Sequence, residues 1–285
     1  MTIEVPTISV SEIDEFLLER GDGRWAVLED VILKKAWIVG NFETRREADE
    51  EFERLRETMP LEVLGKERVR EIPETEWRDS YKAHFHAWQF GPLHWVPIWE
   101  KETFKLPPGD QVLWLDPGLA FGTGNHETTR LCVERLVQFA ESHGVGGRVI
   151  DAGCGSGILA LSALKLGFKW VEGFDNDSEA VRVSLENTGL NDLSGKVTFL
   201  EADLERGLRG KSARVVLANI LANVLCEFAE LLVRAVEPGG ILILSGILAQ
   251  EARHVVSVFS AITQGWPVET RAMGEWADVT LHRPS

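Results

Sequence analysis

The chain has 285 residues, of which 44% are hydrophobic and 26% charged, and its formal net charge is −15. This balance excludes an intrinsically disordered chain, and the length fits one large domain or a catalytic domain with a smaller companion. The acidic surplus argues against direct nucleic-acid binding and suits a basic protein partner, although acidity for solubility alone is an equal explanation. Without an apolar run of membrane-span length or a signal-peptide pattern, we expect no membrane association and a cytoplasmic location.

The first 72 residues indicate short strands alternating with helices. We expect strands at residues 2–10, 25–31, 36–42 and 61–72, separated by helices at residues 11–20 and 45–59. Thr44 is the predicted N-cap of the second helix, and Pro60 ends it. The order β-α-β-β-α-β is that of a ferredoxin-like α+β domain. A domain of this size, residues 1–72, more often recognises a substrate than performs chemistry.

The next segment, residues 73–105, is rich in aromatic side chains. It carries four tryptophans, Trp77, Trp88, Trp95 and Trp99, which is too many for a flexible linker. We therefore expect an aromatic-rich linker made of a helix and an extended strip, packed against the domain that follows.

Residues 106–285 alternate strands and helices in the manner of an α/β domain. The expected strands are residues 148–151, 170–175, 196–200, 213–218 and 240–245, followed by a hairpin of residues 268–273 and 276–282. This pattern predicts a doubly wound Rossmann-like sheet with helices on both faces and a C-terminal antiparallel hairpin.

A glycine cluster follows the first of these strands. Gly153, Gly155 and Gly157 come between a β-branched strand and an apolar helix, where glycine permits a sharp turn and close approach of a ligand. A dinucleotide site uses the spacing Gly-x-Gly-x-x-Gly instead, and here Asp151 precedes the first glycine by two positions. An acid beside backbone amides suits the ammonium and carboxylate of S-adenosylmethionine better than it suits a diphosphate.

Two further acids follow neighbouring strands. Asp175 ends the next strand, where a carboxylate can accept hydrogen bonds from both ribose hydroxyls of a nucleoside. One of Asp177 and Ser178 is expected to cap the following helix. Asp203 is either close to the adenine or a solvated loop acid.

Asn219 ends the fourth strand, at the sheet edge where ligands of α/β folds bind. A neutral amide can accept a hydrogen bond from an amine and orient its lone pair without adding a second anion. We predict this catalytic role for Asn219 and place it in the cofactor site as well. Asn223, four residues later, is better interpreted as a helix-start residue.

A loop rich in Gly, Thr and Asn spans residues 115–129, just before an amphipathic helix. Thr128 or Thr129 is expected to cap that helix, whereas His126 alone has the pattern of a polar loop residue. Other histidines lie among aromatic residues without acids or cysteines at ligand spacing, and the three cysteines are isolated, so no metal is predicted.

Taken in order, the loop at 115–129, the strand and glycines at 149–160 and the segment Ala218-Asn-Ile-Leu-Ala222 resemble the PrmA family, methyltransferases of ribosomal protein L11. The resemblance covers nearly all of the second half of the chain and matches the N-terminal part in pattern. It implies S-adenosylmethionine as cofactor and methyl transfer to amines, especially lysine ε-amines. It also implies that Phe121, Thr123 and His126 line the cofactor pocket.

Three alternatives stay open from the sequence alone. The chain could methylate another protein or a small amine, it could be an NAD-dependent oxidoreductase, or it could be a binding protein that has kept the cofactor fold. The glycine spacing disfavours the oxidoreductase, and Asn219 disfavours the binding protein. We expect a monomer whose partner is the basic ribosomal protein.

Overall fold

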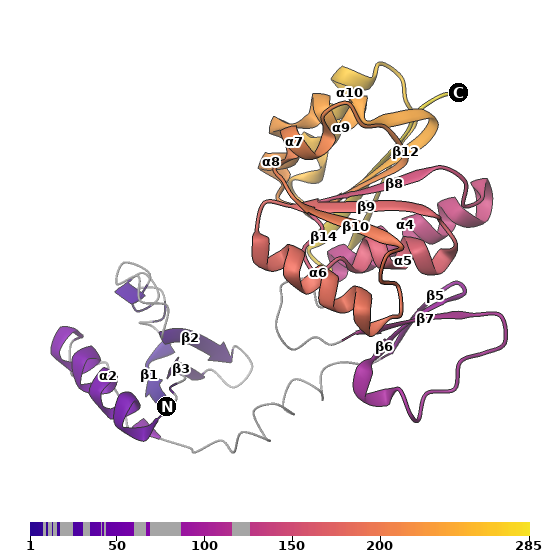
Figure 1. Ribbon diagram of the computed structural model, residues 1–285. Helices are drawn as coiled ribbons and strands as arrows, with labels where there is room; N and C mark the ends of the chain where they lie inside the picture. The colour runs from indigo at the N-terminus through magenta and orange to yellow at the C-terminus, as the bar shows by residue number, and fades with distance from the viewer. Residues whose placement is uncertain are drawn as a thin grey trace. The chain divides into compact units, whose positions relative to one another are not determined.

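The computed structural model describes residues 1–7, 10, 13, 16, 17, 25–30, 35–40, 42, 44–59, 67, 68, 87–115 and 126–285. It divides the chain into two compact units, Met1–Tyr81 and Lys82–Ser285. Figure 1 shows the helices and strands of both units. In the described residues, no helix has the length and apolar character needed to cross a membrane.

The first unit contains a four-stranded sheet in the order β2-β3-β1-β4. Its strands are β1 (Thr2–Val5), β2 (Trp25–Asp30), β3 (Lys35–Gly40) and β4 (Glu67–Arg68). Strand β1 lies antiparallel between β3 and β4, and β2 pairs antiparallel with β3. This order and its antiparallel pairing agree with the ferredoxin-like arrangement expected from the sequence. Most of the first expected helix, residues 11–20, lies outside the described residues.

Helix α2 (Arg45–Thr58) begins where the sequence predicts it. The side chain of Thr44 accepts a hydrogen bond from the backbone N–H of Glu47 at 3.1 Å, which confirms Thr44 as the N-cap. The apolar stripe of the helix joins the inward-facing strand residues in one core, made up in part of Ile3, Val5, Ile38, Phe52 and Leu55.

The second unit is built on a seven-stranded sheet in the order β10-β9-β8-β11-β12-β14-β13. Its strands are β8 (Arg148–Ala152), β9 (Trp170–Asp175), β10 (Val197–Glu201), β11 (Ala213–Asn219), β12 (Val236–Leu248), β13 (Val268–Met273) and β14 (Trp276–His282). Strands β8 to β12 run parallel, whereas β14 is antiparallel to β12 and to β13. The Rossmann-like sheet and its C-terminal hairpin are thus confirmed.

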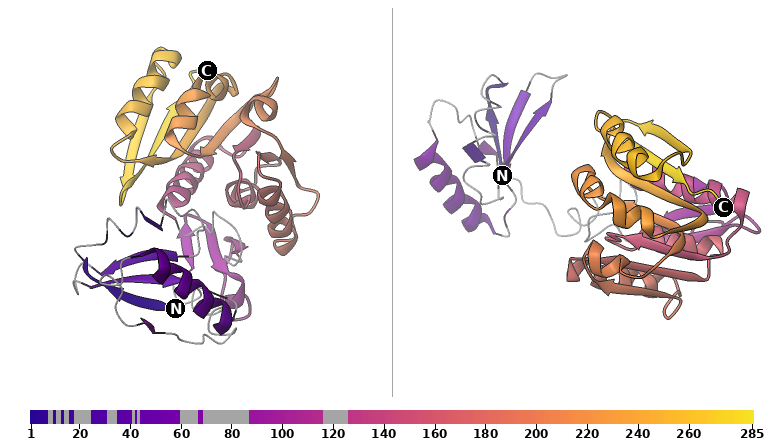
Figure 2. Two further views of the ribbon diagram at one scale, coloured as in Figure 1. Left: turned by 90° about the vertical axis from the view of Figure 1, so that its left-hand side faces the viewer. Right: turned by 90° about the horizontal axis from the view of Figure 1, so that it is seen from above.

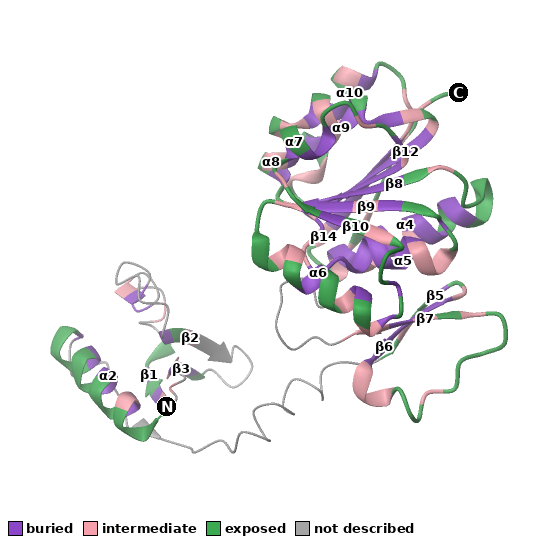
Figure 3. Ribbon diagram, in the orientation of Figure 1, coloured by how far each residue is buried: buried purple, intermediate pink, exposed green. Residues whose placement is uncertain are grey.

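Helices cover both faces of this sheet (Figure 1, Figure 2). They are α4 (Glu127–His143), α5 (Ile158–Leu166), α6 (Ser178–Leu190), α7 (Leu204–Leu208), α8 (Ala222–Glu227), α9 (Ala229–Arg234) and α10 (Ala252–Thr263). Alternate strand residues enter different cores: Val149 packs with α4 and α5, whereas Ile150 packs with α8, α9 and α10. The central strands are therefore buried on both sides (Figure 3), which explains why they are almost continuously apolar.

A small three-stranded sheet also belongs to the second unit. It consists of β5 (Trp88–Phe90), β6 (Leu93–Pro97) and β7 (Gln111–Leu115), with a short 3-10 turn, η3 (Ile98–Glu100), after β6. Trp95 is fully buried, and its indole Nε1 donates to Ser162 Oγ of α5 at 3.0 Å. This anchoring explains the aromatic composition of the segment.

The observed elements differ from the expected ones in several places. Strand β1 was expected to reach residue 10, but it ends at Val5, and residue 10 is helical. The segment 73–105 was expected to be a linker. Its described part, residues 87–105, instead contributes β5 and β6 to the second unit, where β5 pairs with β6 and β6 pairs in parallel with β7. The predicted helix of this segment lies outside the described residues. Strand β12 is longer than the predicted 240–245, since it pairs with β11 at Val236 and with β14 at Leu248.

Candidate functional site

Three predicted residues come together at the carboxyl ends of adjacent strands. Asp151 of β8 is paired in register with Leu217 of β11 on one side and with Gly173 of β9 on the other. Asn219 and Asp175 each lie two residues beyond those partners, so they flank Asp151 at the same edge of the sheet. This is the edge at which ligands of parallel α/β sheets bind.

The three glycines make the turn from β8 to α5. All three have positive φ, 73° at Gly153, 51° at Gly155 and 77° at Gly157, a region that other residues rarely adopt. A Cβ atom would lie 2.5 Å from Ile220 Cγ2 at Gly153 and 2.7 Å from Phe199 Cζ at Gly157. The structure therefore explains Gly153 and Gly157 by the sharp turn and by packing inside the protein, and the packing was not foreseen from the sequence.

Asp151 is fully buried, and only one of its two carboxylate oxygens accepts a hydrogen bond. Its Oδ2 accepts a hydrogen bond from the Ala160 N–H at 3.0 Å, whereas Oδ1 has no partner among the described residues. Burial, and secondarily the charge of Asp175, raises the pKa of Asp151 to about 7. An ammonium group placed against Oδ1 would satisfy the orphaned oxygen and stabilise the ionised carboxylate.

Asp175 holds the glycine turn in place. Its Oδ2 accepts from the Gly155 N–H at 2.9 Å, and its Oδ1 accepts from the Asp177 N–H at 3.1 Å. Each carboxylate oxygen keeps a second lone pair, which suits a diol such as the ribose of a nucleoside. The role in holding the turn was missed from the sequence, because it depends on β8 and β9 being neighbours.

Two acids whose roles the sequence left open act as helix caps. Asp177, and not Ser178, caps α6 by accepting from the Glu179 N–H at 2.9 Å. Asp203 is exposed and caps α7 by accepting from the Arg206 N–H at 2.7 Å. Asn223 is the second residue of α8, as its interpretation as a helix-start residue predicts.

Asn219 is half-buried and is fixed by a residue far away in the chain. Its Nδ2 donates to Oγ1 of the buried Thr129 at 3.4 Å. No hydrogen bond to Asn219 Oδ1 is formed by the residues that the structure describes, so this oxygen can serve as an acceptor for an amine. Thr129 was assigned a possible capping role from the sequence, and its contact with Asn219 was missed.

The expected N-cap of α4 was wrong. His126, not Thr128 or Thr129, precedes the helix, and its Nδ1 accepts from the Thr128 N–H at 3.4 Å. The exposed ring of His126 packs edge-on against Trp276 of β14, with centroids 4.8 Å apart. Phe121 and Thr123, the other two residues expected in the cofactor pocket from this loop, lie outside the described residues.

Ile220, the residue after Asn219, packs closely against two glycines, Gly153 and Gly246. A Cβ atom at Gly246, whose φ is 79°, would lie 2.4 Å from the backbone oxygen of Ile220, while Gly153 touches the Ile220 side chain from the β8 turn. The turn that follows β11 is therefore fixed on both sides, and so is the position of Asn219. In the described part of the chain, no group of His, Cys, Asp or Glu is placed to hold a metal ion.

Comparisons with known proteins show the family to which the chain belongs. A family described as "Ribosomal protein L11 methyltransferase (PrmA)" matches residues 4–284. The ribosomal protein L11 methyltransferase of Geobacter metallireducens is 44% identical over 73% of this chain and 67% of its own length. That of Syntrophotalea carbinolica is 36% identical over 95% and 87%. A crystal structure of a ribosomal protein L11 methylase from Lactobacillus delbrueckii superposes with a TM-score of 0.62 and 28% identity, covering 70% of this chain and all of that one.

Proposed function

Because the chain belongs to the ribosomal protein L11 methyltransferase family, we propose that it transfers methyl groups from S-adenosylmethionine to amino groups of ribosomal protein L11, with lysine ε-amines as acceptors. The observation that carries this proposal is the orphaned carboxylate oxygen of Asp151, flanked by Asp175 and Asn219 at adjacent strand ends. At one edge of the sheet, Asp151 would bind an ammonium group and Asp175 would bind a diol. Asn219 would accept a hydrogen bond from the substrate amine.

The residues present fit the cofactor. Asp151 Oδ1 would hold its ammonium group, Asp175 would accept from its ribose hydroxyls, and His126, Phe121 and Thr123 would line the pocket. The bound cofactor supplies a methyl group already activated by a sulfonium, so no side-chain nucleophile is required. The protein's part is to orient the acceptor amine and to exclude water.

Asn219 would orient the acceptor amine. Thr129 engages its Nδ2, which leaves Oδ1 to accept a hydrogen bond from the amine and direct its lone pair. A free lysine is mostly protonated near neutral pH, since its ordinary pKa is about 10.4. Removal from water favours the neutral, nucleophilic form, and the ammonium gives up its proton to water before transfer.

The proposed substrate is tested directly by incubating the chain with isotope-labelled S-adenosylmethionine and purified ribosomal protein L11. We expect label on lysine residues of the ribosomal protein, located by mass spectrometry. Label on another protein of a cell lysate, with none on ribosomal protein L11, would overturn the substrate while leaving methyl transfer intact.

Replacing Asp175 with alanine is expected to weaken S-adenosylmethionine binding about 10- to 100-fold, because hydrogen bonds to a charged group contribute about 1.5–3 kcal/mol. Calorimetric titration measures this change, and the melting temperature reports any loosening of the glycine turn. Glu186→Ala, which removes an exposed partner of Arg182 in the same unit, is the control. A dissociation constant equal in both variants would remove Asp175 from the ribose site.

Cofactor binding at pH 6 is expected to release a proton. The free protein with a pKa of about 7 at Asp151 is mostly protonated there, and the ammonium of the cofactor requires the carboxylate, so affinity rises as the pH increases through this value. The folded state responds in the opposite direction: its stability decreases from about pH 4 to about pH 7, because burial disfavours the ionised acid. Calorimetric titrations in two buffers of different ionisation enthalpy measure the number of protons released on cofactor binding.

Asp151→Asn is the matched variant for this titration, because it keeps the side chain's size and removes its proton exchange. We expect no proton release at pH 6 from this variant. Equal proton release from the wild type and from the variant would assign the linkage to another group.

A further inference from the structure

A basic hollow lies at the opposite edge of the seven-stranded sheet from the candidate site. It has a volume of about 600 Å³ and is lined by Gln111, by the turn between α5 and β9, and by the turn between α6 and β10. A smaller hollow of about 240 Å³ shares Lys169, Gly195 and Lys196 with it and continues to Arg148 and Trp170. The two adjoining hollows together form one groove. Since Trp170 begins β9, this groove lies at the amino ends of the strands. Asp151 and Asn219 lie at the carboxyl ends.

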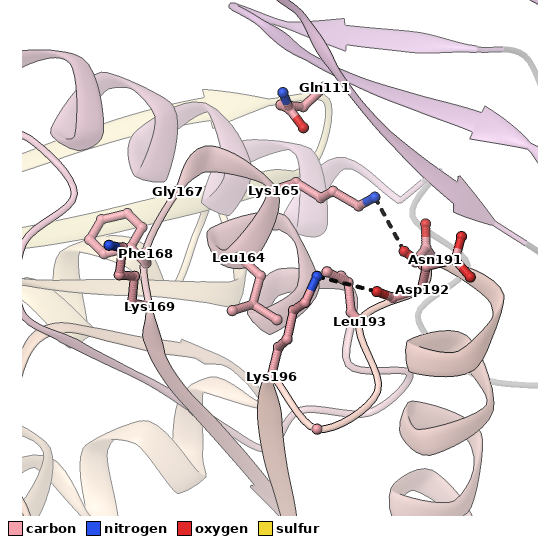
Figure 4. A pocket seen from close by; sticks show the side chains of 11 residues that line it. Gln111, Leu164, Lys165, Gly167, Phe168, Lys169, Asn191, Asp192, Leu193 and Lys196 are labelled. Carbon is pink, nitrogen blue, oxygen red and sulfur yellow. Dashed lines mark hydrogen bonds between the residues drawn. The ribbon is translucent and has the colours of Figure 1, made fainter.

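The groove concentrates positive charge in an acidic chain. Its larger hollow is lined by three lysines, Lys165, Lys169 and Lys196, and by one acid, Asp192. The ammonium groups of Lys165 and Lys196 reach only backbone oxygens, those of Asn191 and Asp192, each at 3.4 Å (Figure 4). Among the described residues, neither lysine forms an ion pair with a carboxylate.

The remaining charges along the groove do not cancel this surplus. In the smaller hollow, Glu172 is engaged by Lys211 at 3.0 Å and lies 3.9 Å from Arg148. Burial lowers the pKa of Lys165, Asp192 opposes this, and the charges of Lys196 and Lys101 lower it further. Cations that repel one another at fixed positions are stabilised by an anion placed between them.

An aromatic side chain accompanies these cations. Trp170 is 65% exposed and lines the smaller hollow. A large aromatic side chain at the surface leaves apolar area in contact with water unless a partner covers it. Lysines along a groove, with an exposed aromatic ring on which a base can stack, form the general pattern of a single-strand binding surface.

We propose that this groove binds single-stranded nucleic acid, with phosphates against Lys165, Lys169 and Lys196 and one base stacked on Trp170. The net charge of −15 that argues against nucleic-acid binding is a property of the whole chain, whereas binding depends on the local distribution of charge. The acidic remainder of the surface would confine the strand to the groove. This proposal is independent of the proposed substrate.

The test is fluorescence anisotropy of a labelled oligonucleotide of about 10 nucleotides, titrated with the full chain at several salt concentrations. We expect binding that weakens with salt. In the double variant Lys165→Gln/Lys196→Gln, the slope of log affinity against log salt should decrease by about 1.4, since each lost phosphate contact removes about 0.7. Trp170→Ala should weaken binding about tenfold, and Trp170→Phe should retain most of it.

The double variant Arg234→Gln/Arg253→Gln, which removes two exposed cations from α9 and α10, is the charge-matched control and should bind like the wild type. Methylation of ribosomal protein L11 should be unchanged in the groove variants, which separates this proposal from the proposed function. Absence of binding at low salt would overturn it, as would equal binding by the control and the lysine double variant. Displacement of the oligonucleotide by inorganic phosphate at equal concentrations would overturn it too, because it would indicate a site for small anions only.

Discussion

Replacing Asn219 with alanine is expected to lower methyl transfer about 100-fold while leaving the dissociation constant of S-adenosylmethionine nearly unchanged. Loss of the Oδ1 acceptor leaves the amine without a fixed orientation, and misplacement of a reacting group by about 1 Å can cost about 100-fold in rate. Single-turnover kinetics with saturating cofactor measure the chemical step directly.

Asn223→Ala is the matched control for this experiment, because it removes the same side chain from an exposed position four residues later, in α8. Thr129→Val should give an intermediate loss, since it keeps the side chain's shape and removes the hydroxyl that engages Asn219. Equal turnover in Asn219→Ala and Asn223→Ala would remove Asn219 from catalysis.

The second large effect is expected at Gly246. Alanine there should lower the free energy of unfolding by about 2–4 kcal/mol, because its Cβ would have to lie 2.4 Å from the backbone oxygen of Ile220 and its φ is 79°. Neither Ile220 nor Gly246 can shift without moving the turn that carries Asn219. Turnover should therefore decrease even at temperatures where the variant is fully folded. Chemical denaturation and initial rates at low temperature measure the two effects.

Gly210→Ala separates backbone strain from the clash. Gly210 also has a positive φ, 67°, but its added Cβ would meet no atom within 4 Å. We expect it to cost only about 1 kcal/mol. If Gly246→Ala and Gly210→Ala lose the same stability and keep full turnover, the close packing of Gly246 against Ile220 has no part in positioning Asn219.

Local sequence signals predicted the second unit well. The strands β8, β9 and β11 are short apolar runs with a polar residue at or next to their carboxyl end. Glycines follow the first of them, which is the pattern of a buried parallel strand entering a ligand turn. Their neighbouring positions follow from the Rossmann-like order. The sequence alone was therefore enough to place Asp151, Asp175 and Asn219 at one edge of the sheet.

What could not be predicted depends on contacts between distant segments. Thr129 and Asn219 are separated by 90 positions, and nothing in the local pattern around Thr129 distinguishes a helix cap from a partner of the site. The close packing of Gly153 and Gly246 against Ile220 brings together the turn after β8, the turn after β11 and strand β12. The pairing of β6 with β7 was missed for a similar reason, because a parallel pair joined by a loop leaves no hairpin signal.

The local clustering of positive charge could not be predicted from the composition either. A net charge of −15 describes the whole chain, but the last turn of α5 and the loops after α5 and α6 bring Lys165, Lys169 and Lys196 to one hollow. Lys165 and Lys169 are close in the sequence, but Lys196 belongs to a later segment, so the fold is needed to bring the three lysines together.

A crystal structure of the chain with S-adenosylhomocysteine tests the central claim most directly. The ammonium nitrogen of the ligand should lie about 3 Å from Asp151 Oδ1, with the ribose hydroxyls at a similar distance from Asp175. A ligand bound elsewhere on the chain, or bound at this edge with Asp151 Oδ1 still unpartnered, would contradict the account.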